Sequence, residues 1–343
     1  LWPAVAAGSL LVGLYSLRDF GAVTLLQFST FTRVIYNRYL GFQLDQAATL
    51  ALVLVLMAGI VLLSESRLRR DKQESPTEID DPARCKVLKL GRWRWPAFLF
   101  SGLVSILALG LPVGLLVYWV SRGLQKPASP AGTATMAADS ALAFSDLLAP
   151  AGSSLAAALL TAVLALVVAL PIALLSVRSK RRSARLFERL SYSSYALPGI
   201  VVALAFVYVG INIARPLYQT LPMLLAAYMV LFVPLAVAAE RSALLRVPRE
   251  LEEVGYSLGG SRLAILRHVT LPLMKPGLLA GGMLIFLTVM KELPVALLLS
   301  PLGFRTLPML VWSNISEAFF ARAAIPTLAL LLLSSAPLAW LSL

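Results

Sequence analysis

The chain has 343 residues, of which 59% are hydrophobic and 14% are charged, whereas soluble domains carry about 25% charged residues. This composition excludes an ordinary soluble protein. The net charge of +13 does not indicate nucleic-acid binding, because the basic residues gather in particular loops. Apolar runs recur that are long enough to cross a hydrocarbon core of about 30 Å as helices, and no segment alternates like the strands of a membrane barrel. The sequence therefore predicts an all-α fold, a polytopic transmembrane bundle in the lipid bilayer.

Eight spans are predicted along the chain, and the loops between them differ in charge. The spans lie at roughly 3–27, 46–64, 96–120, 154–177, 194–214, 219–240, 273–299 and 320–341. Nine Lys and Arg residues fall in 65–95, six in 178–189 and six in 241–275, against seven in all the intervening loops. Basic loops stay on the cytoplasmic side, so these three loops and both termini are predicted to be cytoplasmic.

The first segment resembles a later one. Leu1 lies inside an apolar run with no charged region before it, which argues against a signal peptide and leads us to expect an N-terminal truncation. Sliding the sequence by 273 pairs Pro3 with Pro276, Gly8 with Gly281, Arg18-Asp19 with Lys291-Glu292, and Phe31 with Phe304. The chain is therefore predicted to contain the last two helices of a first half (1–64), a cytoplasmic linker (65–95) and a second six-helix half (96–343), arranged as parallel repeats.

Four ionisable residues fall inside the apolar spans, at matching depth in the two halves. They are Arg18, Asp19, Lys291 and Glu292, and Pro294 follows the second pair. Ionisable groups inside a span usually face a cavity, the bundle interior or one another, and Pro294 is expected to loosen the helix there. Two interpretations stay open. These residues line the outer end or gate of a translocation path, or they serve a structural role as ion pairs or by reaching the headgroups.

Three other features carry no catalytic or metal-site prediction. The single cysteine, Cys85, excludes an internal disulfide and argues against a thiolate metal site. The segment 121–152 is small and polar and is assigned no site. The outer loops 28–45 and 300–319 occupy equivalent places in the two halves, where an external protein could bridge them.

The loop 247–272 is the largest cytoplasmic loop of the second half. Val247, Leu251, Val254 and Leu258 follow helical spacing and form one apolar stripe. Pro248 suits the first helical turn, and acidic residues early in the helix complement its dipole. A short amphipathic helix of this kind either inserts into a groove of a partner protein or lies on lipid headgroups, and the sequence pattern does not separate the two.

A second short helix is predicted after a glycine elbow. Gly259-Gly260 can end the first helix in a left-handed conformation, and Ser261 is a plausible N-cap. The second helix, at about 262–269, carries Leu263, Leu266 and Val269 on one side. Leu271-Pro272 is expected to end it and lead into the next span.

The spacing of this loop resembles a known motif. Glu253-Val254-Gly255, three residues, Gly259, nine residues and Val269-Thr270-Leu271-Pro272 are similar to the EAA loop of ABC importer permeases, with Val254 and Gly255 in place of two alanines. In that family the loop forms a coupling helix that docks in a cleft of the ATPase subunit. The predicted coupling residues are Leu251, Glu253, Val254, Gly255, Leu258, Gly259, Leu263, Leu266, Val269, Leu271 and Pro272.

The resemblance extends to the cargo. MKELPVALLLSPLGFRTLPMLVWSNISE is similar to the closing segment of ferric-iron permeases, and RDFGAVTLLQFSTFTRVIY to the equivalent segment of their first half. The resemblance implies a multi-pass permease of the bacterial cytoplasmic (inner) membrane that passes ferric iron from an external or periplasmic binding protein by alternating access. Thiamine, phosphonate, and sulfate or molybdate permeases share the architecture and remain alternatives.

No cofactor is predicted on this chain itself. It has no phosphate loop of the Gly-x-x-x-x-Gly-Lys-Ser/Thr type, so ATP would be bound and hydrolysed by a separate, dimeric ABC ATPase. No clustered ligands indicate a metal site, and His268 is expected to be a surface residue. A membrane enzyme has no supporting motif. The alternative of another class is an ion-coupled secondary transporter, in which the intramembrane charge pairs would act as ion relays.

Overall fold

The computed structural model describes residues 2–70, 91–125, 145–179, 194 and 197–342, and every regular element in these ranges is helical. The predicted all-α fold is therefore confirmed for the described residues. The centre of the predicted linker with Cys85, most of 121–152 and most of the basic loop 178–189 lie outside them.

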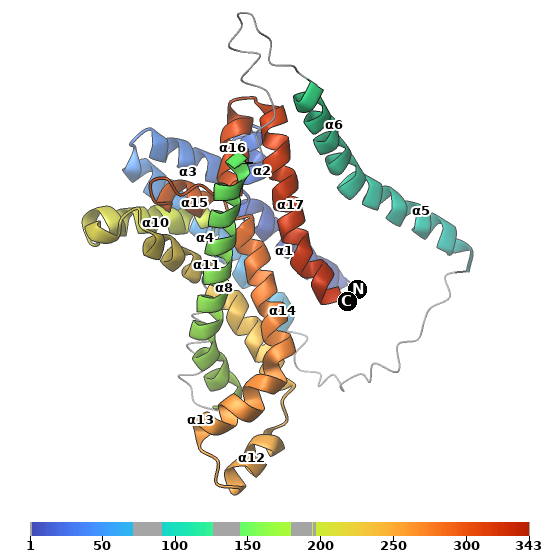
Figure 1. Cartoon of the computed structure of the whole chain (residues 1–343), viewed down its shortest axis with the longest axis vertical. Helices are drawn as coiled ribbons and strands as arrows, with labels where there is room; N and C mark the ends of the chain where they lie inside the picture. The colour runs from blue at the N-terminus through green and yellow to red at the C-terminus, as the bar shows by residue number, and fades with distance from the viewer. Residues whose placement is uncertain (1, 71–90, 126–144, 180–193, 195–196, 343) are drawn as a thin grey trace, which may run out of the picture.

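The helices follow the chain order shown in Figure 1, whose labels are used here. The first group comprises α1 (Trp2–Arg18), α2 (Gly21–Leu25), α3 (Phe31–Leu40) and α4 (Leu44–Arg70). The middle group comprises α5 (Arg94–Ser105), a π-turn at Ile106–Gly110, α6 (Leu111–Gln125), α8 (Ser145–Arg178), α10 (Gly199–Asn212) and α11 (Leu221–Leu245). The last group comprises α12 (Arg249–Ser257), α13 (Arg262–Ile265), a π-turn at Leu266–Thr270, α14 (Leu271–Met290), α15 (Pro294–Leu299), α16 (Leu307–Ser316) and α17 (Phe320–Ser342).

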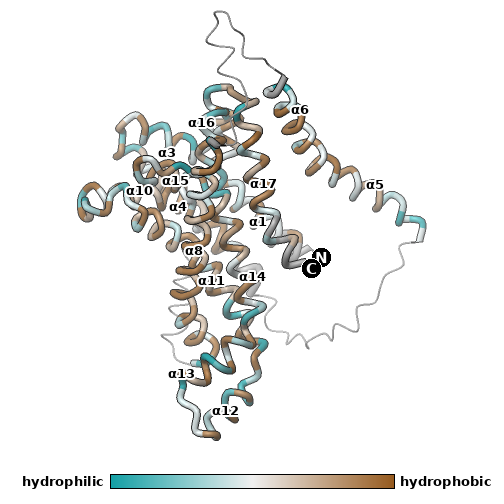
Figure 2. The backbone as a smooth tube through the Cα atoms, in the orientation of Figure 1, coloured by the Kyte–Doolittle hydropathy of each residue, from teal (hydrophilic) through white to brown (hydrophobic). Residues whose placement is uncertain are grey.

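Five helical stretches are long and apolar enough to cross a membrane. They are Leu44–Ser64, Gly91–Gly123, Asp146–Arg178, Leu221–Leu245 and Arg262–Met290. Shorter apolar helices lie at Gly199–Asn212 and Phe320–Ser335. Figure 2 shows the long apolar runs along α8, α11 and α14, with hydrophilic residues gathered near α12 and α13.

Two predicted spans are interrupted, which corrects the sequence-based interpretation. The span predicted at 273–299 is broken between Met290 and Pro294, and the span at 3–27 is broken between Arg18 and Gly21. At the break between Met290 and Pro294 the cause is local, because Pro294 has no N–H to donate and its ring crowds the carbonyl four residues earlier. The charged pairs therefore lie at helix ends and not in the middle of continuous helices.

The two interrupted segments fold alike. Each continues from its break into a short helix (α2 or α15), a helix of ten residues (α3 or α16) and a longer one (α4 or α17). Thr30 and Thr306 are both extended N-caps of the ten-residue helices. Gln27 and Gly303 both take positive φ before these helices, and Phe42 and Ala318 take positive φ after them. The structure thus pairs Thr30 with Thr306, and the predicted pairing of Phe31 with Phe304 is wrong because the second connection is longer.

The centre of the bundle is formed by α8, α11 and α14, which pack against one another. Small residues let α11 and α14 approach closely: Gly277 faces Ala243 and Gly281 faces Ala239, an arrangement typical of membrane helix pairs. In contrast, the apolar window of the α5–α6 stretch buries no residue, and α6 contacts the rest of the fold chiefly along α17. Figure 1 shows α5 diverging from the bundle.

Candidate functional site

The segment from α12 to the π-turn (residues 249–270), here called the elbow, projects beyond the bundle at the lower end of Figure 1. Its bend is built from glycine. Gly259 has φ +84°, and the N–H groups of Gly259 and Gly260 donate to the carbonyls of Tyr256 and Gly255 at 2.9 and 3.0 Å. This is the hydrogen-bond pattern of a Schellman helix end.

The second arm of the elbow is capped and packed as a unit with the first. Ser261 Oγ accepts from the backbone N–H of Ala264 at 3.3 Å, as an N-cap does. Ile265 is buried under Gly255 and Gly260, where a Cβ would come within 3.0 and 3.2 Å of its Cγ1. Gly255 therefore serves close packing between the two arms, which explains why a glycine stands where the resembled motif has alanine.

The predicted apolar stripe is largely uncovered. Leu251 and Val254 are exposed, and Leu258 and Leu263 expose 84% and 73% of their surface. Glu253 is also exposed, while Leu266, Val269 and Leu271 are half-buried where the chain enters the bundle. An uncovered apolar stripe at the tip of a polar elbow is the surface expected of a contact site.

Two details of the elbow differ from the sequence prediction. Pro248 is the N-cap of α12 and not its first helical residue. The second helix does not end at Leu271-Pro272, because the helical path continues without a break from Arg262 to Met290. Leu271-Pro272 follows directly on the π-turn at Leu266–Thr270, where the hydrogen-bond register of the helix shifts.

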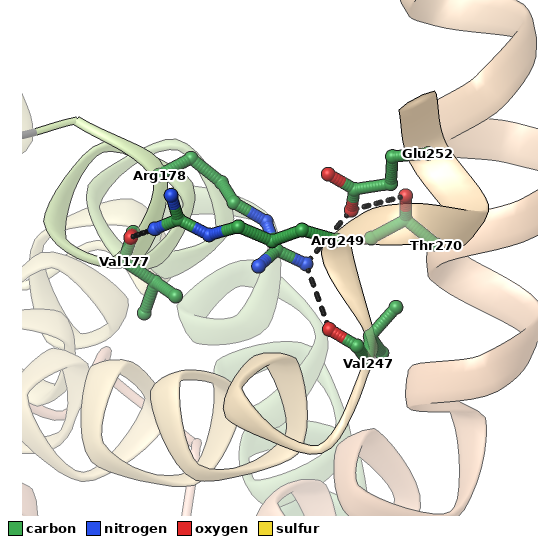
Figure 3. Close-up of polar contacts among 6 residues, drawn as sticks. All are labelled: Val177, Arg178, Val247, Arg249, Glu252 and Thr270. Atoms are coloured by element: carbon green, nitrogen blue, oxygen red, sulfur yellow. Dashed lines mark hydrogen bonds and ion pairs between the residues drawn. The ribbon is translucent and has the colours of Figure 1, made fainter. Parts of the chain in front are cut away.

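A group of polar contacts joins the elbow to the end of α8 (Figure 3). Arg178 Nη2 donates to Glu252 Oε1 at 2.9 Å and to the carbonyl of Val247 at 3.1 Å. Thr270 Oγ1 donates to the same Glu252 oxygen at 3.1 Å, and Arg249 Nη2 donates to the carbonyl of Val177 at 2.6 Å. We call Arg178, Arg249, Glu252 and Thr270 the clamp.

Sequence reasoning missed the clamp. It selected Glu253, which is exposed, and left its neighbour Glu252 unassigned. The available signal was the position of Glu252 off the apolar stripe, together with the cluster of basic residues that begins at Arg178. Which acidic residue faces that cluster depends on how α12 is rotated against α8, and spacing along the chain does not fix this.

The intramembrane charges meet in one place. Arg18, Asp19, Lys291, Glu292 and Pro294 all line a cavity of about 450 Å³, here called the outer cavity. It lies between the breaks of the two related segments, and Gly199 at the start of α10 also lines it. Arg18, Lys291 and Glu292 line the same cavity, so charges of both signs share it.

Glu292 is held against a helix start. Its Oε1 lies so close over Gly199 that a side chain at that position would collide with it. This oxygen is buried and has no hydrogen-bond partner among the described residues. The absence of a side chain at Gly199 therefore permits the carboxylate to lie on the N-terminal end of α10, where the helix dipole favours negative charge.

One aromatic ring from each segment, Phe20 and Trp312, lines the outer cavity, and Tyr36 packs against both without lining it. The rings of Phe20 and Trp312, from α16, have centroids 5.5 Å apart, and Tyr36 of α3 stands edge-on to Phe20 at 5.2 Å. Among the described residues no three His, Cys, Asp or Glu side chains gather as metal ligands would. The outer cavity is thus a chamber with charges of both signs and an aromatic wall.

Comparison with known sequences gives three findings. Residues 166–342 match the family described as binding-protein-dependent transport system inner membrane component. Over 340 residues the chain is 34% identical to the Fe(3+)-transport system permease protein FbpB 2 of Haemophilus influenzae, covering 98% of this chain and 65% of that protein. Over 139 residues it is 30% identical to PhnV of Salmonella typhimurium, which is named for 2-aminoethylphosphonate transport, covering 40% of this chain and 52% of that protein.

Among solved structures, the chain is similar to the MetNI methionine ABC transporter in an inward-facing conformation. The two share 16% sequence identity and a TM-score of 0.46, over 59% of this chain and 94% of that one.

Proposed function

The chain belongs to the family of binding-protein-dependent transport system inner membrane components, and from this premise we propose that it is a membrane subunit of an ATP-driven importer. Members of the family are permease components and not enzymes. We place it as a multi-pass protein of the bacterial cytoplasmic membrane, consistent with its apolar helices. Residues 1–64 and 96–343 would be the end of one permease half and the whole of another, a division supported by the matching turns of the two segments.

The observation that carries the proposal is the elbow. Its apolar side chains Leu251, Val254, Leu258 and Leu263 are uncovered, and its spacing resembles the loop that docks in an ABC ATPase. A cytoplasmic ATPase dimer would cover this stripe and push the elbow during ATP binding and hydrolysis. The permease would then alternate between inward-open and outward-open states by rigid-body rearrangement.

The cargo is proposed from similarity and not from ligand chemistry. The relative with 34% identity is named for Fe(3+) transport, and it matches over almost the whole chain. We therefore propose ferric iron, delivered by an external binding protein that would contact the outer loops 28–45 and 300–319. The match to PhnV over 139 residues keeps phosphonates as the second candidate.

The outer cavity is the proposed outer end of the translocation path. Charged side chains of both signs from two related segments line it, and such groups inside a membrane mark transport pathways. Among the described residues, the same charges are the feature that favours an ion-coupled secondary transporter, which would need no ATPase.

One experiment tests the proposal. The full-length permease is purified with and without its cognate ATPase and placed in sealed vesicles with the external binding protein, and uptake of radiolabelled ferric iron is measured. Uptake should require the ATPase and ATP, and Glu253→Arg should abolish copurification of the ATPase. Uptake without nucleotide would favour the secondary transporter, and uptake of a phosphonate in place of iron would change the cargo alone.

A further inference from the structure

The clamp is reciprocal. Arg178, at the end of α8, donates to the carbonyl of Val247 just before α12, while Arg249 of α12 donates back to the carbonyl of Val177. Figure 3 shows the two arginine side chains crossing in opposite directions between the helices. The side chains of Arg178 and Glu252 are 20% and 15% exposed, so the ion pair between them is shielded from water and stronger than a surface pair.

The contacts of α12 itself with α8 are polar, while Val247, just before α12, is buried in an apolar cluster against which Leu174 and Val177 of α8 pack. None of the nine residues of α12 is buried, and Arg178, Glu252 and Thr270 of the clamp line a cavity of about 740 Å³ between the elbow and α8. Within the elbow, in contrast, Gly255 and Gly260 close tightly over Ile265. The two arms of the elbow are thus packed tightly against each other. A few directed hydrogen bonds connect the elbow to α8.

The other end of α8 reaches the wall of the outer cavity. A helix of 34 residues is about 50 Å long at 1.5 Å per residue. Near its beginning, buried Ser154 Oγ accepts from the backbone N–H of Leu307 at 2.8 Å, at the first residue of α16. α16 in turn supplies Pro308, Val311 and Trp312 to the outer cavity. One helix therefore has a polar contact with the elbow at one end and with the cavity wall at the other.

We propose that the clamp is the joint through which displacement of the elbow moves α8, and through α8 the α16 wall of the outer cavity, with Arg178 and Glu252 as its positioning residues. This inference rests on the proposed function, because it needs a partner that displaces the elbow. Breaking the joint should leave the partner bound to the elbow and active, while its motion no longer reaches α8 and the α16 wall; the continuous helix Arg262–Met290 stays in place, so transport is reduced and not abolished.

The test compares Arg178→Gln, Glu252→Gln and the double variant in the full-length permease with its ATPase. Glu252→Gln keeps the size of the side chain and an acceptor for Thr270, so it tests the charge with the least risk to folding. Control variants are Glu250→Gln on the same helix and Arg246→Gln, both exposed residues. ATPase copurification, ATP hydrolysis and substrate uptake are measured on the same vesicles.

We expect each single variant to retain the ATPase and ATP hydrolysis but to lose about 10-fold in uptake per ATP hydrolysed, and the double variant to lose no more than either single one, since the two residues act as a pair. The controls should match the wild type. Wild-type uptake in the clamp variants, additive losses of about 100-fold in the double variant, or loss of ATPase binding with Glu252→Gln would each overturn the inference. A wild-type permease that transports without ATPase would overturn the proposed function instead.

Discussion

The close approach of α11 and α14 makes a quantitative prediction for Gly277. A Cβ at this position would lie 2.5 Å from Ala243 Cβ and 3.3 Å from Ala243 Cα, whereas carbon atoms in contact prefer about 3.5–4.0 Å. Gly277→Ala therefore requires the helices to separate by about 1 Å. Overpacking of this kind costs about 1–3 kcal/mol, although the alanine gains about 1 kcal/mol in helix propensity.

A matched variant removes the propensity term from the comparison. Gly59 lies in α4, and a Cβ there would meet nothing within 4 Å, so Gly59→Ala gains helix propensity without overlap. The thermal unfolding midpoint of the purified permease should be lower for Gly277→Ala than for Gly59→Ala, by a difference in unfolding free energy of about 1–3 kcal/mol. Adding Ala243→Gly moves the methyl group from one helix to the other and should restore the midpoint nearly to that of the wild type.

The reasoning would be refuted by either of two results. If Gly277→Ala unfolds at the same temperature as Gly59→Ala, the two helices do not approach as closely as described. If the double variant is no more stable than Gly277→Ala alone, the overlap with Ala243 is not the source of the loss.

Three further predictions concern the elbow and the outer cavity. Glu292→Ala should lower substrate uptake while the ATPase still copurifies, and unchanged uptake would remove this residue from the path. Gly259→Ala places a side chain at φ +84°, which should destabilise the elbow by about 1–2 kcal/mol. ATPase binding, measured by titration, should be weaker as a result. The control is Gly13→Ala, at a helical glycine with open space around it. Ser261→Ala removes the N-cap and should cost about 1 kcal/mol, seen as faster hydrogen exchange at Ala264 and not at Ser257.

Local signals were sufficient to predict the elbow. Its first helix, the bend at Gly259-Gly260 and the cap at Ser261 each depend on neighbouring residues, and all three occur in the structure. The signal for the apolar spans is equally local, because the length of a hydrophobic run alone indicates a membrane helix. The placement of Arg18, Asp19, Lys291 and Glu292 around one cavity agrees with the predicted matching depth, while their role in transport stays a prediction.

Contacts between residues of different helices could not be predicted from the sequence. Glu252 contacts Arg178 across 74 positions of the chain, and nothing near Glu252 distinguishes it from Glu253. The fit of Gly199 under Glu292 and of Gly277 against Ala243 likewise requires the packed structure. The continuation of the helix through Pro272 was missed because a π-turn has no clear sequence signature.

Because the two related segments break at matching places, the charged residues at one break can be compared directly with those at the other. Asp19 and Glu292 offer the same functional group on side chains that differ by one methylene, and Arg18 and Lys291 are likewise two versions of one cation. A change made on one side can therefore be copied at its counterpart within the same polypeptide. Unequal effects of such twin substitutions on uptake would show that the two related segments contribute differently to the proposed translocation path.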